Sequence, residues 1–208
     1  MTIRSLFSNH SILLISCLSL VAGSARVDAG EEASLDAKAS SVKFVGDSFL
    51  HSFHGEAKDM SGSAGVDPAA VPPVQNAVLH FKTAELTTFH KGRDEKMFAW
   101  LNVKAHPEAV FQLEHVKLMA GDYKTADEGH PARFQVQGSF TLNGSKQALT
   151  GSALGWRDKD HLVVSGETVV DTLKYGLPQI REAFMTVATE VKVSYKLSFV
   201  LPSEYSVK

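Results

Sequence analysis

The sequence predicts an all-β domain of about eight antiparallel strands with one sealed apolar face. Residues 134–142 alternate strictly between apolar and polar side chains, and residues 191–199 near the C-terminus do the same. Alternation with period two places the apolar side chains of a strand on one face, so one side of the sheet is buried and the other is wet. Asn143-Gly144 follows the first segment directly and is a strong signal for a two-residue hairpin.

A sheet of this kind buries its apolar face either as a sandwich or as a closed barrel. Periodicity alone does not choose between the two, and a barrel of about eight strands is either filled by side chains or holds one ligand. The segments with strand-like composition are 41–48, 52–59, 77–82, 110–119, 134–142, 147–156, 161–170 and 191–199.

Two inserts between the predicted strands are expected to be helical. In residues 94–101, Met97, Trp100 and Leu101 recur at helical spacing, and Pro107 bars a continuation of the helix. The second insert is residues 178–184. If the domain is a barrel, these inserts are expected to cap or gate its opening.

The first 29 residues are predicted to be a secretory signal peptide, which leaves residues 30–208 as one domain. Arg4 precedes the apolar stretch 11–22, and small residues lead up to Ala29. This stretch is shorter than the ~20 residues that a helix needs to span a bilayer. We therefore expect an exported protein, which in a bacterium would be located in the periplasm or elsewhere in the cell envelope.

A lipoprotein processing site is the alternative at this terminus. Leu14-Ile15-Ser16-Cys17 is similar to a lipoprotein cleavage box, and lipidation of Cys17 would attach the mature protein to a membrane. Cys17 is the one cysteine of the chain, so cleavage after Ala29 would leave a domain without thiols or disulfides. Its stability would then rest on its apolar core.

The charge balance argues against nucleic acid as a partner. Lys and Arg number 21 against 23 Asp and Glu, and no basic stripe is present. Histidines such as His51 and His54 invite a metal interpretation, but residues three apart on a strand point to opposite faces. No recognised metal-binding spacing occurs, so neither a metal nor a cofactor is expected.

In their order and spacing, four patches of the chain resemble the YceI-like family of exported bacterial proteins. The patches are 42–44 with 51–55, 86–97 with His106-Pro107, 134–144, and 171–177 with 191–199. Together they span roughly residues 36 to 202. The chain departs from the family at Thr172, where many members carry an arginine shortly before an aromatic-glycine pair.

The resemblance implies an extended, lipocalin-like antiparallel β-barrel that holds a long apolar molecule along its axis, such as a polyisoprenoid or a fatty amide. It supplies no catalytic residue. The candidate ligand-binding residues are those expected to face the interior or its opening: Phe44, His51, Phe53, Phe81, Met97, Trp100, Phe111, Phe134, Phe140 and Tyr195, with Trp156 as a further candidate. The alternative is that these aromatic residues simply fill the core.

Arg93-Asp94 is the most conspicuous polar pair. We interpret it as structural, with Asp94 capping the predicted helix and Arg93 holding the loop, in preference to contact with a ligand's polar head. A head-group hydrogen bond contributes ~1–3 kcal/mol, whereas each buried methylene contributes ~0.8 kcal/mol. For a long ligand the tail therefore dominates the affinity.

The leading hypothesis is a non-enzymatic protein that sequesters or carries a long apolar lipid: a polyisoprenoid, an isoprenoid quinone or a fatty amide. An isomerase or cyclase acting on an apolar substrate in the same cavity is the first alternative, and His51 or Glu114 would be its candidate titratable groups. An envelope interaction module with a filled core is the second. Family resemblance leaves a homodimer open, but no exposed apolar stripe in the sequence demonstrates one.

Overall fold

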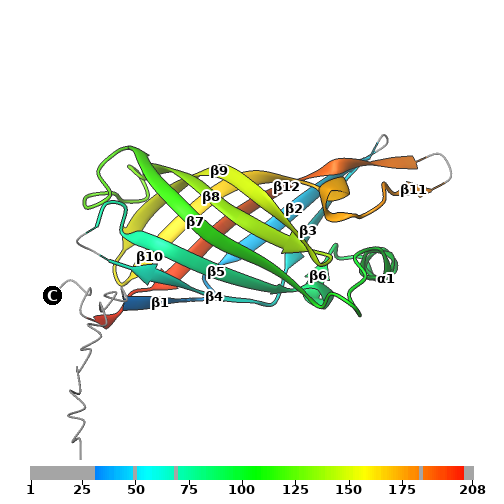
Figure 1. Ribbon diagram of the computed structural model, residues 1–208, viewed down its shortest axis with the longest axis horizontal. Helices are drawn as coiled ribbons and strands as arrows, with labels where there is room; N and C mark the ends of the chain where they lie inside the picture. The colour runs from blue at the N-terminus through cyan, green and yellow to red at the C-terminus, as the bar shows by residue number, and fades with distance from the viewer. Residues whose placement is uncertain (1–30, 49–50, 68–69, 183–184, 204–208) are drawn as a thin grey trace, which may run out of the picture.

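Antiparallel pairing runs without a break around the molecule and closes it into a long barrel (Figure 1). The computed structural model describes residues 31–48, 51–67, 70–182 and 185–203. The predicted signal peptide and Cys17 lie outside these residues. The strands are β1 Glu31–Leu35, β2 Ser41–Ser48, β3 Ser52–Ala57, β4 Met60–Val66, β5 Val74–Lys82, β6 Leu86–Thr87, β7 Glu108–Ala120, β8 Ala132–Leu142, β9 Ser145–Asp158, β10 His161–Asp171, β11 Arg181–Glu182 and β12 Met185–Val200.

The barrel has eight walls because several of these strands are consecutive pieces of one wall. β1 and β2 both pair with β12, one after the other along its length. β4 pairs with β1 and β3 pairs with β2, so β3 and β4 form the next wall. β5 and β6 form a third wall, joined by the 3-10 turn Thr83–Glu85. β7, β8, β9, β10 and β12 complete the ring. The predicted closed, lipocalin-like barrel is confirmed.

The hairpin predicted from Asn143-Gly144 joins β8 to β9. Leu142 pairs with Ser145 across the turn, which leaves two residues in the loop. Asn143 has φ 50° and Gly144 has φ 71°, so both adopt the left-handed conformation that a type I′ turn requires. Asparagine and glycine tolerate this conformation best, which is why the sequence signal was reliable here.

The first predicted insert is a helix, α1 Lys91–Trp100, which begins three residues earlier than expected. Its N-cap is His90, whose Nδ1 accepts from the Arg93 amide at 3.3 Å. The prediction that Asp94 caps this helix is therefore wrong. Asp94 instead lies in the first turn and binds the preceding loop.

The second predicted insert is not helical, and this prediction is also wrong. Residues 178–180 have no regular structure, and β11 pairs with the start of β12 as a hairpin. Pro178 cannot donate a backbone hydrogen bond, and the amide of Val187 donates to the carbonyl of Ile180 at 3.0 Å. The helical turn in this region lies earlier, as the 3-10 segment Thr172–Tyr175. Phe184 lies outside the described residues.

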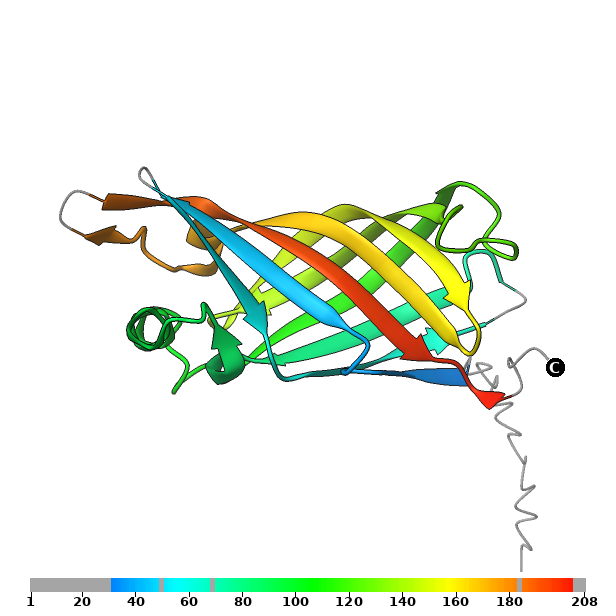
Figure 2. The ribbon, with the colours of Figure 1, turned by 180° about the vertical axis from the view of Figure 1, so that it is seen from behind.

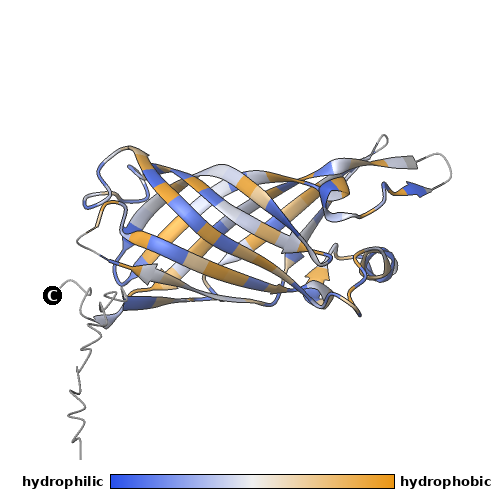
Figure 3. Ribbon diagram, viewed as in Figure 1, coloured by the Kyte–Doolittle hydropathy of each residue, from blue (hydrophilic) through white to orange (hydrophobic). Residues whose placement is uncertain are grey.

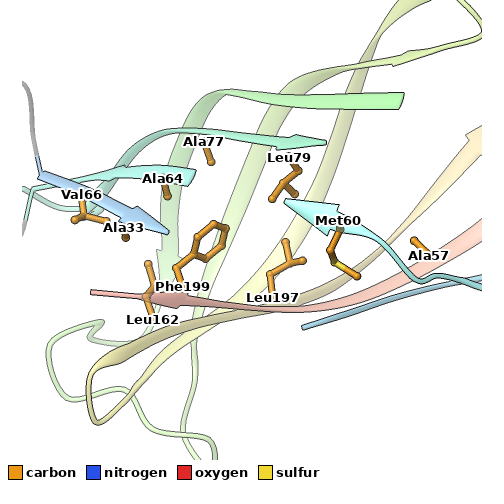
Figure 4. Packing of buried hydrophobic residues seen from close by; sticks show 10 residues of the cluster. All are labelled: Ala33, Ala57, Met60, Ala64, Val66, Ala77, Leu79, Leu162, Leu197 and Phe199. Carbon is orange, nitrogen blue, oxygen red and sulfur yellow. The ribbon is translucent and has the colours of Figure 1, made fainter. Parts of the chain in front are cut away.

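The two ends of the barrel differ. α1, β6 and the β11–β12 hairpin gather at one end, called the mouth below (Figures 1 and 2). At the opposite end, apolar side chains from facing walls meet in a packed cluster. Figure 4 shows Leu197 and Phe199 of β12 pointing across to Ala64, Met60 and Leu79 of β4 and β5. The packed end is therefore closed by side chains, whereas the mouth is bordered by α1 and its neighbouring loops.

Polar and apolar residues alternate along the strands, as the sequence predicted (Figure 3). On β12, Val191, Val193 and Tyr195 face inward and are partly buried, while Lys192 and Lys196 are exposed. The inner face is therefore apolar and the outer face is wet. No helix of the described residues is long and apolar enough to cross a membrane.

Candidate functional site

An interior cavity of about 900 Å³, called the lumen below, runs along the barrel from the mouth to the packed end. Ligand-binding pockets for small molecules typically measure about 300–1,000 Å³, so this one is large. Its walls are mainly aliphatic and aromatic side chains from every wall of the barrel. The polar lining residues at the mouth come from α1 and the segments beside it. The lumen contradicts the filled-core alternative.

Nine of the ten candidate residues from the sequence line this lumen. Most of them lie on strands from several walls of the barrel, and Met97 and Trp100 contribute to the lumen wall from α1. His51 and Phe53 share a face, as expected, whereas His54 is exposed on the outside. The nine are Phe44, His51, Phe53, Phe81, Met97, Trp100, Phe111, Phe140 and Tyr195.

Phe134 is the exception, and it does not line the lumen. It is buried in a separate cluster with Ala126, Ala132 and Trp156, where the loop 121–131 packs against the end of β8. Trp156 is also absent from the lumen wall, and the exposed Lys196 ammonium lies 5.4 Å from its ring centroid. Alternation gave the face of Phe134 correctly but could not tell how far along the barrel the open space extends.

Glycines opposite the aromatic residues keep the lumen open. Gly46 pairs with Phe53, and Gly55 pairs with Phe44 across the same two strands. A Cβ at either glycine would overlap the facing ring, so each ring lies flat against the wall. Tyr195 lies over its partner Gly166 in the same way. Without a side chain beneath it, an aromatic ring contributes apolar surface and leaves the barrel axis free.

A related contact occurs at Gly138, which pairs with Leu113. A Cβ added at Gly138 would lie 2.9 Å from the ring of Phe111, two residues before Leu113 on β7. Sequence reasoning identified the aromatic residues but missed the glycines. A signal was available, since glycine within a strand marks a close approach of another group. What the sequence could not supply is the register that places each glycine beside a particular ring.

Hydrogen bonds fix α1 over the mouth. The Trp100 indole Nε1 donates to the Pro178 carbonyl at 2.7 Å, which connects α1 to the segment before β11. At the other end of the helix, Asp94 accepts from the Thr87 hydroxyl at 2.8 Å, the Thr88 amide at 2.7 Å and the Thr88 hydroxyl at 2.5 Å. Met97 and Trp100 are thus held at the opening of the lumen.

Asp94 gives this attachment a pH dependence. Burial alone raises the pKa of the Asp94 carboxyl, but the hydrogen bonds from Thr88 and Thr87 outweigh it and hold the pKa below its usual value of 3.8. A carboxyl whose pKa is lower in the folded state stabilises the fold fully above its unfolded pKa. That stabilisation is lost as the pH falls through the folded pKa.

We therefore expect Asp94→Asn to loosen α1 at neutral pH by about 1–2 kcal/mol, because the amide cannot accept all three bonds as an anion does. Hydrogen exchange of the α1 amides at pH 7 measures this. In the parent, protection should also decline below about pH 4, and in the variant this decline should be absent. Asp158→Asn, at the exposed last residue of β9, is the control. Equal α1 protection in all three proteins would contradict the assignment.

Few titratable groups face the lumen. Burial raises the pKa of the Tyr195 hydroxyl, so it stays protonated at neutral pH. Glu114, one candidate for an enzymatic role, is exposed and does not line the lumen, whereas His51 lies at the mouth. The described lining residues include no Asp or Glu, and the described chain holds no cluster of metal-ligating side chains.

Comparison with known proteins gives one family and a set of similar barrels. A family model described as the YceI-like domain matches residues 34–199. BcnA of Burkholderia cenocepacia is 18% identical, with a TM-score of 0.66 over 79% of this chain and 98% of its own. A polyisoprenoid binding domain from Saccharophagus degradans is 17% identical, with a TM-score of 0.64 over 82% and 98%. The YCEI protein of Campylobacter jejuni is 14% identical, with a TM-score of 0.58 over 72% and 85%. No curated protein matches the chain.

Proposed function

Because the chain belongs to the YceI-like family, we propose that it is an exported, non-enzymatic binding protein that sequesters or carries a long apolar lipid in its lumen. The observation that supports this most is the continuous apolar lumen of about 900 Å³. The structurally similar domain from Saccharophagus degradans, described as polyisoprenoid binding, points to the same class. Polyisoprenoids, isoprenoid quinones and fatty amides are the proposed ligands.

The driving force is removal of the lipid tail from water. Each methylene that enters the lumen contributes ~0.8 kcal/mol, and this sum must exceed the costs of immobilising protein and ligand. The flat aromatic rings over Gly46, Gly55 and Gly166 supply apolar surface along the path of the tail. α1 and the β11–β12 hairpin border the mouth, so a lipid would enter and leave between them.

Native mass spectrometry of protein purified from a bacterial periplasm tests the proposal. We expect a co-purified apolar molecule and, after its removal, a gain of thermal stability when an isoprenoid lipid is added. A ligand at 100 times its dissociation constant adds about 2.7 kcal/mol to the free energy of unfolding. Protein that is always empty and gains no stability from such lipids would overturn the proposal. The intact mass also tests cleavage after Ala29 against lipidation at Cys17.

A further inference from the structure

Positively charged side chains gather at the mouth of the lumen. Three cations line it, Arg93 and Lys96 on α1 and Arg181 on β11, and no Asp or Glu stands among the described lining residues. Figures 1 and 2 show α1 and the β11–β12 hairpin at the same end of the barrel. His90 and Gly92 also line the lumen, so the N-terminus of α1 adds its partial positive charge there.

The two arginines differ from the cations on the outer surface. Lys82 and Lys192 pair with Asp59 and Asp47 on the outside of the barrel. Arg93 instead lies over the Phe53 ring, 5.3 Å from its centroid. Asp94, the acid beside Arg93, accepts hydrogen bonds from Thr87 and Thr88, and its interaction with Arg93 is electrostatic only.

Arg181 is likewise held by a neutral group. Its Nε and Nη2 donate to the Gln179 Oε1 at 3.3 and 3.0 Å. Lys96 interacts with another group, so the two arginines are the candidate partners of a ligand. Each guanidinium has five N–H donors in a planar fork, and each retains donors for an incoming group.

We propose that the mouth selects amphiphiles whose head is a carboxylate or a phosphate, with the tail in the lumen. This inference rests on the proposed function and narrows its ligand class. Guanidinium groups bind these two oxyanions through paired, charge-assisted hydrogen bonds, which are stronger than bonds to neutral acceptors. The tail sets most of the affinity, and the head sets the preference among lipids with equal tails. An amide, alcohol or quinone head would form only the weaker hydrogen bonds of a neutral acceptor with these arginines.

Pairs of probes with identical tails test the preference. Calorimetry compares oleate with oleamide, and farnesyl phosphate with farnesol, on the delipidated protein. We expect the anionic member of at least one pair to bind about 10- to 100-fold more tightly, the range for charge-assisted bonds to a guanidinium. The pair with the larger ratio tells whether the head is a carboxylate or a phosphate. The preference should shrink at high salt, because the mouth is open to solvent.

Variants assign the preference to the mouth. In Arg93→Gln/Arg181→Gln the affinities for oleate and oleamide should converge. Lys117→Gln, which removes a cation from the exposed outer face of β7, is the matched control and should keep the ratio of the parent. Equal binding within both pairs by the parent, or a ratio that survives in the double variant, would overturn the inference and leave the proposed lipid binding intact. Failure of all four probes to bind would overturn both.

Discussion

Gly151→Phe is expected to weaken the binding of long apolar ligands about 100-fold while the barrel stays folded. Gly151 lines the lumen midway along β9, and a Cβ there would meet nothing nearer than the Glu167 carbonyl at 3.6 Å. The ring would therefore project into open space. If it excludes roughly four methylenes of the tail, the loss is ~3 kcal/mol, or about 100-fold in the dissociation constant.

Ser152→Phe is the matched control, because it places the same ring one residue further along on the exposed outer face. Titration with a fluorescent fatty amide, together with near-ultraviolet circular dichroism to confirm folding, measures both variants. Binding by Gly151→Phe that equals binding by Ser152→Phe would show that the tail does not pass this point of the lumen.

Gly55→Ala should destabilise the protein by about 2–3 kcal/mol, at the upper end of the cost of overpacking. An added methyl group would overlap the Phe44 ring and would lie 2.6 Å from the Thr87 carbonyl of β6. The ring can turn, but the carbonyl belongs to the backbone that pairs with β3 at Glu56. Relief therefore requires β6 to move away from β3, and β6 leads directly into the loop that holds α1.

The same substitution at Gly151 provides the comparison. Gly151→Ala adds a methyl group that meets only ordinary contacts, so its stability should equal or slightly exceed that of the parent. Urea unfolding of the two variants measures the difference in free energy. A Gly55→Ala protein as stable as Gly151→Ala would contradict the proposed close packing of Phe44 on β3.

Sequence reasoning recovered the long strands because each had a full alternating pattern. It missed β1, β4 and β6, since Glu31–Leu35, Met60–Val66 and Leu86–Thr87 are short or rich in glycine and serine. Each of these three short strands shares a wall of the barrel with a strand that was predicted. Each is held in place by pairing with a segment distant in the sequence, so local sequence patterns could not identify it. The prediction of a helix in the second insert was wrong for a related reason, because the strand β11 found there depends on its pairing with β12.

The candidate site was likewise predicted in part. Side-chain alternation and family resemblance placed nine of ten predicted residues on the lumen wall. The prediction for Phe134 was wrong because a local pattern gives the face of the strand on which a residue lies but not how far the lumen extends along the barrel. The arginines at the mouth come from α1 and β11, which are brought to the same end of the barrel only by folding, so their placement at one opening was not visible in the sequence.

The sequence alone determined that this protein is an antiparallel β-protein with one apolar face, because that conclusion needs only the period of side chains along each strand. The choice of a barrel over a sandwich came from the family resemblance and was confirmed by the pairing of the strands. Tertiary structure decided that the barrel is hollow. Whether an aromatic residue such as Phe44 or Tyr195 fills the axis or lies flat depends on the residue facing it across the sheet, here Gly55 and Gly166. That register is set by pairing between segments far apart in the chain, which no local pattern encodes.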